Sequence, residues 1–287
     1  MTQSLSEYYN RYRKKWEREP VYGESWLRLT YQHPLGRMAQ ATLIKRRVFS
    51  SLYGKAMDGA SSRMKIRPFI KKYGIDTSEF LDPVEQYGSF NEFFFRRLKP
   101  ESRPVDPDPD AIVFPADGRH LFLENAAQAH DFYIKGQSFQ LDRLLRDKTL
   151  AERYRESPVL ISRLCPLDYH RFHFPCAGIP TEARVVPGPL YSVNPLALSS
   201  VSDILWTNKR AISQLQTKEV GCILIVEIGA TCVGSIQQTY QPGQRVGKGQ
   251  EKGYFCFGGS TVLTIFPEGV VSFDRDLREQ SSQGVEL

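Results

Sequence analysis

Ser260 follows two glycines in the stretch Gly258-Gly259-Ser260, close to the C-terminal end of the sequence. The residues around it read as a strand interrupted by the glycine pair, and such glycines mark a bulge or a close approach to the backbone. In one interpretation the pair forms a turn between two strands, and Ser260 is an ordinary turn residue. The local sequence alone favours this interpretation. In the other, the Ser260 hydroxyl attacks the carbonyl of Gly259, its neighbour in the chain.

His170 and His173 lie close together in the stretch YHRFHFP, and this proximity weakens the usual interpretation of a lone histidine as a core residue. Asp117 precedes a glycine after a short apolar run, where aspartate is usually a turn former. Asp117, a histidine and Ser260 nevertheless supply the parts of an Asp-His-Ser relay. In such a relay the carboxylate orients the imidazole, and the imidazole takes the hydroxyl proton. Spacing alone leaves both interpretations open.

The composition is that of a globular protein, with 287 residues of which 41% are hydrophobic and 24% are charged. This length can bury a sizeable core, as one large domain or two small ones. The 38 basic and 32 acidic residues leave a modest positive charge, which is compatible with an anionic membrane or nucleic acid and argues for neither. The five cysteines are spread without a C-x-x-C pair, which disfavours a disulfide framework or a thiolate zinc site.

The first residues lack the apolar core of a signal peptide, and no apolar run approaches the roughly 18–20 residues of a membrane span. We therefore expect a protein that is soluble or attached to a membrane surface.

The N-terminal third reads as helical. A mixture of basic and aromatic residues predicts a solvated helix or a loose terminus over residues 8–19. Apolar residues then recur every three or four positions over 34–56, which predicts an amphipathic helix that packs on the core or lies on a membrane. Another helix is expected over 62–73, and Ser89 with Glu92 forms a capping box before a further helix. Residues 100–109 read as a linker.

Beyond the linker the sequence breaks into short β-branched runs bounded by Gly and Pro, at 111–115, 159–164, 223–228 and 262–266. This pattern predicts a largely antiparallel sandwich or barrel, with helices near 139–155 and 200–215. The fold class is therefore α+β: an N-terminal helical segment over 1–100, which could face a membrane, and a β-rich body over 101–287.

Six stretches of the sequence, taken together and in order, resemble the phosphatidylserine decarboxylase family. They span about residues 22–270, and their ordered set is far more specific than any one of them. They are residues 88–98 (GSFNEFFFRRL), 115–118 (PADG), 169–175 (YHRFHFP), 191–195 (YSVNP), 229–235 (GATCVGS) and 258–261 (GGST). Many members carry Leu-Gly-Ser-Thr at the cleavage site, where this chain has Gly-Gly-Ser-Thr. The Gly-Gly-Ser-Thr form is also familiar in the family, so the difference bears on the subgroup to which the chain is assigned more than on its activity.

The resemblance implies a proenzyme that cuts itself between Gly259 and Ser260, into a large subunit (1–259) and a small one (260–287). It implies that Asp117 and His173 activate Ser260, with His173 as the general base. Residue 260 would then become a covalent pyruvoyl group, the only cofactor expected, with no metal. His170 matches a histidine of the decarboxylation step, where it would supply the proton.

The implied reaction converts phosphatidylserine to phosphatidylethanolamine and CO2 through a Schiff base with the pyruvoyl group, a step of phospholipid biosynthesis. The expected partners are the lipid, an anionic membrane surface and the chain's own two subunits. A homodimer is common in the family, and no nucleic acid is expected. By analogy, the protein would lie on the cytoplasmic face of a bacterial inner membrane, held partly by Arg46, Arg47 and the basic cluster from Arg11 to Arg18.

Three rival functions use the same residues differently. A metal-dependent hydrolase would take His170, His173 and Asp117 as ligands. A Ser-His-Asp hydrolase would act on an external substrate and keep Ser260 as a serine. A non-enzymatic membrane-binding module would use the basic, aromatic N-terminus. Only self-cleavage produces a fragment that ends at Gly259.

Overall fold

The computed structural model describes residues 7–34, 36, 47–130, 137–201, 203–230, 236–258 and 260–287. Several residues to which the sequence points lie outside these ranges. Gly259 and Arg46 are among them, as are residues 37–46 of the amphipathic stretch, most of the 229–235 motif, and the side chain of Arg47.

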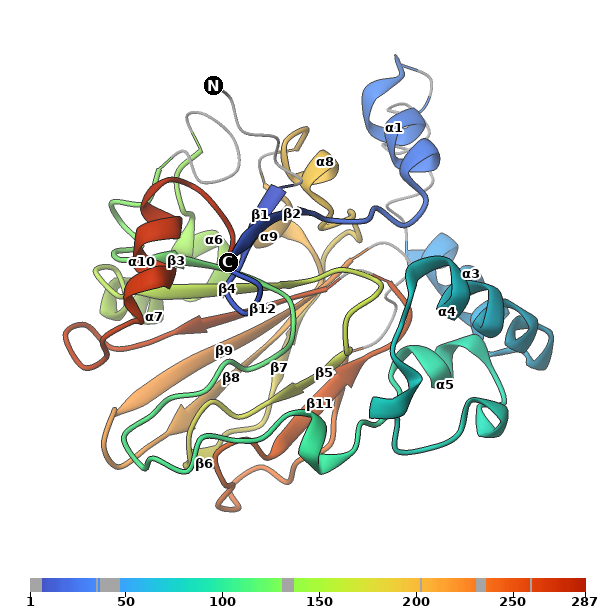
Figure 1. Ribbon diagram of the computed structural model, residues 1–287. Helices are drawn as coiled ribbons and strands as arrows, with labels where there is room; N and C mark the ends of the chain where they lie inside the picture. The colour runs from blue at the N-terminus through green and yellow to red at the C-terminus, as the bar shows by residue number, and fades with distance from the viewer. Residues whose placement is uncertain are drawn as a thin grey trace.

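A seven-stranded antiparallel sheet forms the centre of the molecule (Figure 1). Its strands run in the order β3-β4-β12-β9-β8-β6, with β7 also paired to β8. Their bounds are β3 Arg119–Leu123, β4 Val159–Leu164, β12 Ser260–Ile265, β9 Cys222–Gly229, β8 Arg210–Gln216, β6 Ile179–Pro180 and β7 Arg184–Val186. The strand that begins with Ser260 therefore lies in the interior of the sheet, hydrogen-bonded on both sides.

A second, three-stranded sheet joins β10 (Ile236–Gln238), β11 (Glu251–Phe255) and β5 (Arg171–His173). Its buried aromatics pack against one face of the large sheet, where Phe172 and Phe255 share an apolar cluster with Val262. Leu263, the next residue of β12, belongs instead to the cluster on the opposite face. This alternation is the period of two expected for a strand buried on both faces.

Short helices cover that opposite face of the large sheet. They are α6 (Leu141–Leu145), α7 (Lys148–Arg153), α8 (Pro195–Leu198) and α9 (Ile204–Thr207). Leu144, Leu198 and Trp206 supply apolar contacts to the cluster. The layers define an α+β, sandwich-like fold in which the sheets do not close into a barrel, and this confirms the predicted class.

The first described residues form a β-hairpin, so the prediction of a helix or loose terminus over 8–19 was wrong. Its strands are β1 (Glu7–Asn10) and β2 (Lys15–Arg18). The hairpin is held to the C-terminal end of the chain, because the Tyr9 amide donates to the Glu286 carbonyl at 2.9 Å. Arg11, predicted to face a membrane, instead binds Asp274 and Asp276 beside α10 (Arg275–Ser282). These contacts are long-range, which is why the local sequence did not reveal a strand.

Helices between residues 24 and 102 follow the hairpin. They are α1 (Glu24–Gln32), α3 (Arg47–Asp58), α4 (Ile66–Tyr73) and α5 (Phe90–Phe94), with 3-10 turns η2 (Ala60–Lys65), η3 (Thr77–Glu79), η4 (Val84–Gln86) and η5 (Pro100–Ser102). Aromatic side chains of α4 and α5 form a separate cluster with Phe257, which precedes the glycine pair. The helix expected over 62–73 is confirmed and ends at Gly74, which adopts a φ of 62°.

The cap of α5 is also confirmed, since Ser89 Oγ accepts a hydrogen bond from the Glu92 amide at 3.1 Å. Glu92 reaches back to the amide of Gly88 rather than that of Ser89, at 2.6 Å. The division at residue 100 stays a prediction, because the hairpin packs on the body across it.

Three strands of the body, β4, β9 and β12, were predicted correctly. The run at 111–115 forms no strand. The helix expected over 200–215 was wrong in its second half, because residues 210–216 pair with β9 as strand β8. The helical stretch over 139–155 is confirmed as the two helices α6 and α7.

Candidate active site

Ser260 opens strand β12 and is fully buried between β4 and β9, where it lies opposite Leu164 and Gly229. Gly258, two residues earlier, has a φ of 136°, a conformation that side chains rarely tolerate. The glycine before the strand is therefore required by the backbone, and the serine lies at the first position of a strand in the interior of the sheet.

His170 is the residue that contacts the Ser260 hydroxyl. Its Nδ1 lies 3.2 Å from Ser260 Oγ, and its Nε2 lies 2.9 Å from the carbonyl oxygen of Cys165. A carbonyl can only accept, so Nε2 carries the proton of the neutral ring and Nδ1 offers a lone pair to the hydroxyl. Burial lowers the pKa of His170 to about 3, which keeps the ring neutral near pH 7. The ring of Phe94 stacks on it at 3.9 Å between centroids.

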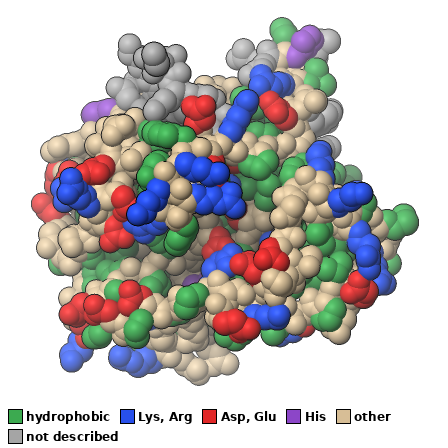
Figure 2. Space-filling model, viewed as in Figure 1, with side chains coloured by type: hydrophobic (Ala, Val, Ile, Leu, Met, Phe, Trp, Pro, Cys, Tyr) green, Lys and Arg blue, Asp and Glu red, His purple; other side chains and the backbone are tan. Residues whose placement is uncertain are grey.

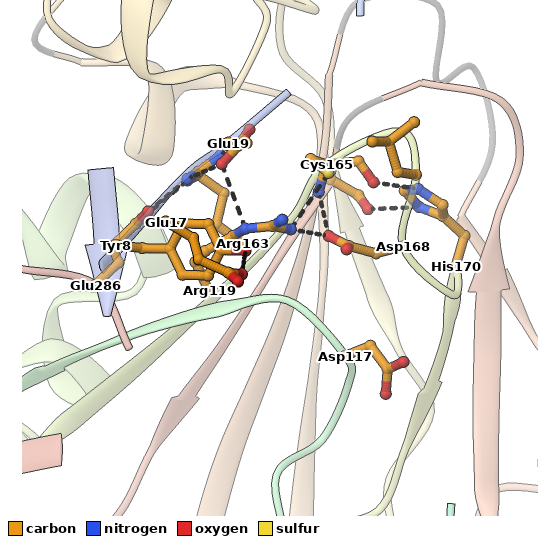
Figure 3. Close-up of polar contacts among 12 residues, drawn as sticks. Tyr8, Glu17, Glu19, Asp117, Arg119, Arg163, Cys165, Asp168, His170 and Glu286 are labelled. Carbon is orange, nitrogen blue, oxygen red and sulfur yellow. Dashed lines mark hydrogen bonds and ion pairs between the residues drawn. The ribbon is translucent and has the colours of Figure 1, made fainter. Parts of the chain in front are cut away.

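The loop that holds His170 is fixed by Asp168, a residue that the sequence pattern did not single out. Asp168 Oδ2 accepts from the Cys165 amide at 2.7 Å and pairs with Arg119 Nη1 at 2.5 Å (Figure 3). Burial by itself would raise the pKa of Asp168, but the Arg119 guanidinium and the Cys165 amide hold that pKa below its usual range. An aspartate two residues before His170 was visible in the sequence, whereas its contact with Arg119 depends on the fold.

His173 is held differently, on strand β5. Its Nδ1 lies 3.0 Å from the carbonyl oxygen of Gly249, so Nδ1 carries the proton and Nε2 offers the lone pair. Within the described residues, Nε2 has no hydrogen-bond partner. Burial lowers the pKa of His173, while the Gly249 carbonyl and the carboxylates of Glu251 and Asp117 oppose that shift.

Asp117 lies on the loop beside β5, because the His173 amide donates to the Pro115 carbonyl at 2.6 Å. Its carboxylate pairs with Arg103 Nη2 at 2.7 Å. Figure 3 shows Asp117 apart from the group formed by Asp168, Cys165 and His170. Among the described residues, no hydrogen bond joins Asp117 or His173 to Ser260. The structure thus brings His170 and Ser260 together, and it places Asp117 near His173.

Two further features of the described ranges bear on the rival functions. No three His, Cys, Asp or Glu side chains in those ranges are grouped so that they could hold a metal ion. No helix in them is long and apolar enough to cross a membrane.

A buried serine that faces the lone pair of a neutral imidazole is the arrangement used by enzymes with a serine nucleophile. The sequence profile of the family described as phosphatidylserine decarboxylase matches residues 90–285. The chain therefore belongs to the phosphatidylserine decarboxylase family, and it is a decarboxylase, which is a kind of lyase.

Three curated relatives, from different bacteria, match nearly the whole chain, and each is named phosphatidylserine decarboxylase proenzyme. The protein of Ruminiclostridium cellulolyticum is 45% identical over 97% of this chain and 93% of its own length. That of Clostridium botulinum is 42% identical over 97% of this chain and 94% of its own. That of Chlamydia pneumoniae is 40% identical over 98% and 93%.

Proposed function

We propose that this protein decarboxylates phosphatidylserine to phosphatidylethanolamine, after cutting its own chain between Gly259 and Ser260. The observation that carries the proposal is the position of the Ser260 hydroxyl. Ser260 is buried at the start of an internal strand, and its Oγ lies 3.2 Å from Nδ1 of the neutral imidazole of His170. The relatives are named proenzymes, which supports self-processing.

In the proposed cleavage, Ser260 Oγ attacks the carbonyl carbon of Gly259, and the peptide bond is exchanged for an ester. Removal of the α-hydrogen of residue 260 then breaks the ester C–O bond and releases the Gly259 carboxylate. The unsaturated residue that remains takes up water and loses ammonia, which leaves a pyruvoyl group at the start of the small subunit (260–287). The glycine on the carbonyl side offers little steric obstruction to the attack.

We assign activation of Ser260 to Asp117 and His173, following the family resemblance. A general base works best when its pKa lies near the working pH. Burial lowers the pKa of His170 to about 3. Burial also lowers the pKa of His173, but there the Gly249 carbonyl and the carboxylates of Glu251 and Asp117 oppose the shift, which favours His173 as the base. The proposal requires His173 Nε2 and the Ser260 hydroxyl to approach each other before the attack.

His170 is assigned to proton transfer at residue 260. The pyruvoyl group, once present, supplies a carbonyl that accepts electrons as CO2 leaves. The surroundings fit such a group, because residue 260 is buried and the imidazole of His170 beside it is covered by the ring of Phe94. His170 Nδ1 faces the side chain of residue 260 and can take up a proton and return it there, since Nε2 is fixed on the Cys165 carbonyl.

The roles of His170 and His173 can be distinguished by denaturing gels and mass spectrometry of purified variants. Wild type should yield a fragment ending at Gly259 and a small one that begins with a pyruvoyl group, and Ser260→Ala should stay full length. His173→Ala and Asp117→Ala should also stay uncleaved, whereas His170→Ala should cleave but release little CO2. Full-length His170→Ala would instead make His170 the base, and cleavage of Ser260→Ala at that bond would overturn the mechanism.

A surface for the lipid bilayer is proposed over α3, η2 and α4. Leu52 and Met64 are 64% and 78% exposed there. Six exposed basic residues accompany them: Lys55, Arg63, Lys65, Arg67, Lys71 and Lys72. Figure 2 shows basic and hydrophobic side chains together over this region, at the right of the view. Basic residues near an anionic leaflet contribute about 1 kcal/mol each, so this face is suited to a membrane surface.

We expect Leu52→Glu combined with Met64→Glu to reduce pelleting with anionic vesicles, because two carboxylates would enter the bilayer interface. Val270→Glu, at an exposed apolar residue outside these three elements, is the control and should pellet like wild type. Deleting residues 1–60 is a poorer test, since it removes Glu19, a buried partner of Arg163. Equal pelleting of the double variant and the control would contradict a membrane role for this face.

A further inference from the structure

Arg96 is a buried cation without a carboxylate partner. It is 5% exposed, and in the described part of the chain no Asp or Glu lies within ion-pair distance of it. Its Nη2 donates one long hydrogen bond, 3.3 Å, to the carbonyl of Leu167, and its Nε is buried without a partner. The rings of Phe80 and Phe93 lie 5.0 and 5.2 Å from the guanidinium carbon.

Two other deeply buried arginines differ in this respect, and a third, Arg210, donates to three backbone carbonyls. Arg163 is paired with Glu19 and Glu286, and Arg119 is paired with Asp168. Leaving a charge buried and unpaired is strongly unfavourable, and contacts with aromatic faces return only part of that cost. Burial accordingly lowers the pKa of Arg96. An anion that binds next to this guanidinium from solution would therefore be stabilised by its unpaired charge.

Arg96 also lines a cavity of about 290 Å³. Its lining is rich in charged groups and comprises Asp82, Gln86, Tyr87, Glu92, Phe95, Arg96, Arg97 and Arg171. Arg97 is paired with Asp82, and Arg171 is paired with Glu251. Glu92 is engaged at the Gly88 amide. Arg96 is therefore the cation of the cavity that has no counter-charge among the described residues.

The cavity adjoins the candidate active site through two segments. Leu167, which accepts from Arg96, belongs to the loop in which Cys165 and Asp168 fix His170. Phe94, two residues before Arg96, stacks on the imidazole of His170. An anion bound at Arg96 would thus lie in the neighbourhood of residue 260.

We propose that Arg96 binds the phosphate of a phosphodiester ligand in this cavity. The inference rests on the proposed function, in which the substrate carries both a phosphate and a carboxylate. A guanidinium fork matches phosphate oxygens well. Binding the departing carboxylate there would instead stabilise the ground state and slow the loss of CO2. The cavity is at the small end of ligand sites, which suits a headgroup rather than acyl chains.

Steady-state kinetics with phosphatidylserine in mixed micelles provide the first test. Arg96→Met should raise KM roughly tenfold or more and change kcat much less, because a contact made equally in ground and transition states is lost. Arg96→Lys should keep part of the affinity. Arg155→Met, which alters an exposed arginine outside this cavity, should leave KM within about twofold of wild type. A normal KM for Arg96→Met would overturn the inference.

Binding to full-length Ser260→Ala protein, measured by calorimetry, separates this inference from the proposed reaction. Glycerophosphoserine and, more weakly, inorganic phosphate should bind, and adding Arg96→Met should weaken both roughly tenfold. Serine, which has the carboxylate without the phosphate, should bind far more weakly than glycerophosphoserine. Equal affinities for serine and glycerophosphoserine would overturn the inference. Affinities that do not change when Arg96→Met is added would also overturn it.

Several outcomes identify which idea fails. Phosphate binding that depends on Arg96, in a wild-type protein that releases no CO2, would contradict the proposed function and retain the phosphate site. Glycerophosphoserine binding much tighter than inorganic phosphate points to the headgroup as the source of the anion, whereas equal affinities point to free phosphate. If circular dichroism shows that Arg96→Met is unfolded, the kinetic and calorimetric measurements are made on Arg96→Lys instead.

Discussion

At the scale of single residues, two histidines are buried as neutral rings. His120 lies 3.0 Å from Ser162 Oγ through Nδ1 and stacks on Phe114 at 4.0 Å. Burial lowers the pKa of His120 to about 3, as it does for His170. An unfolded histidine titrates near pH 6.5. Between about pH 6.5 and 3 the unfolded chain therefore binds protons that the folded chain does not, so stability falls as the pH falls through this window.

His120→Gln should weaken this pH dependence, because it removes one of the groups that take up a proton on unfolding. The slope of unfolding free energy against pH should decrease by up to about 1.4 kcal/mol per unit between pH 6 and 4. Urea unfolding at several pH values measures it. At pH 8 His120 is neutral in both the folded and the unfolded chain, so the difference in unfolding free energy between variant and wild type there gives the packing cost of the substitution. An unchanged slope would show that His120 is protonated in the folded protein.

At the scale of elements, close packing of β5 and β11 positions the segments around residue 260. Gly253 of β11 faces Phe172 of β5 across the small sheet. A β-carbon at Gly253 would come within 2.1 Å of the Gln237 carbonyl oxygen and 2.7 Å of the Phe172 ring. Strand β5 also carries His173, and β11 leads into Gly258.

Gly253→Ala should therefore destabilise the protein by about 1–3 kcal/mol or more, since overpacking forces strands apart. We also expect slower self-cleavage on a denaturing gel, because β5 and β11 flank the proposed reacting groups. Gly247→Ala is the matched control: a β-carbon there meets nothing within 4 Å, so its stability and cleavage should stay close to wild type. Wild-type behaviour of both variants would show that this contact does not position the site.

At the scale of the whole molecule, the two ends of the described chain meet on one buried cation. Arg163 of β4 is 2% exposed and pairs with Glu19 at 2.6 Å and with Glu286. Leu287 exchanges two backbone hydrogen bonds with His120, both at 2.8 Å. If the chain is cut before Ser260 as proposed, Glu286 would belong to the small subunit and Arg163 to the large one. Their ion pair would then be a clasp, that is, a contact that holds the two subunits together.

Glu286→Gln should lower the free energy of unfolding by roughly 3 kcal/mol, the lower end of the range for a broken buried pair, because Glu19 still faces Arg163. In cleaved protein the small fragment should also separate at lower urea concentration, as followed by size-exclusion chromatography. Arg278→Gln, which alters the exposed pair with Glu124 in the same C-terminal region, should change stability by less than about 1 kcal/mol. Equal effects of the two variants would contradict a clasp.

Much of the fold could be predicted from local pattern. The strands β4 and β12 and the helix that ends at Gly74 follow from apolar periodicity and glycine punctuation, which act between near neighbours. The hairpin at residues 7–18 and strand β8 could not be predicted so, because their pairing is decided by contacts with distant segments. The ordered motifs sufficed to indicate the family, since each preserves residues that are close in sequence.

The sequence by itself determined the family and singled out the residues that we propose carry the chemistry: Ser260 after its glycines, two nearby histidines and Asp117. Only the tertiary structure decided that His170 is the histidine that contacts Ser260, across 90 positions of chain. It also decided that His173 is held at Gly249 and that Arg96 is buried without a counter-ion among the described residues. The physical reason is that a hydrogen bond or an ion pair depends on distance in space, which side-chain type and spacing along the chain do not fix.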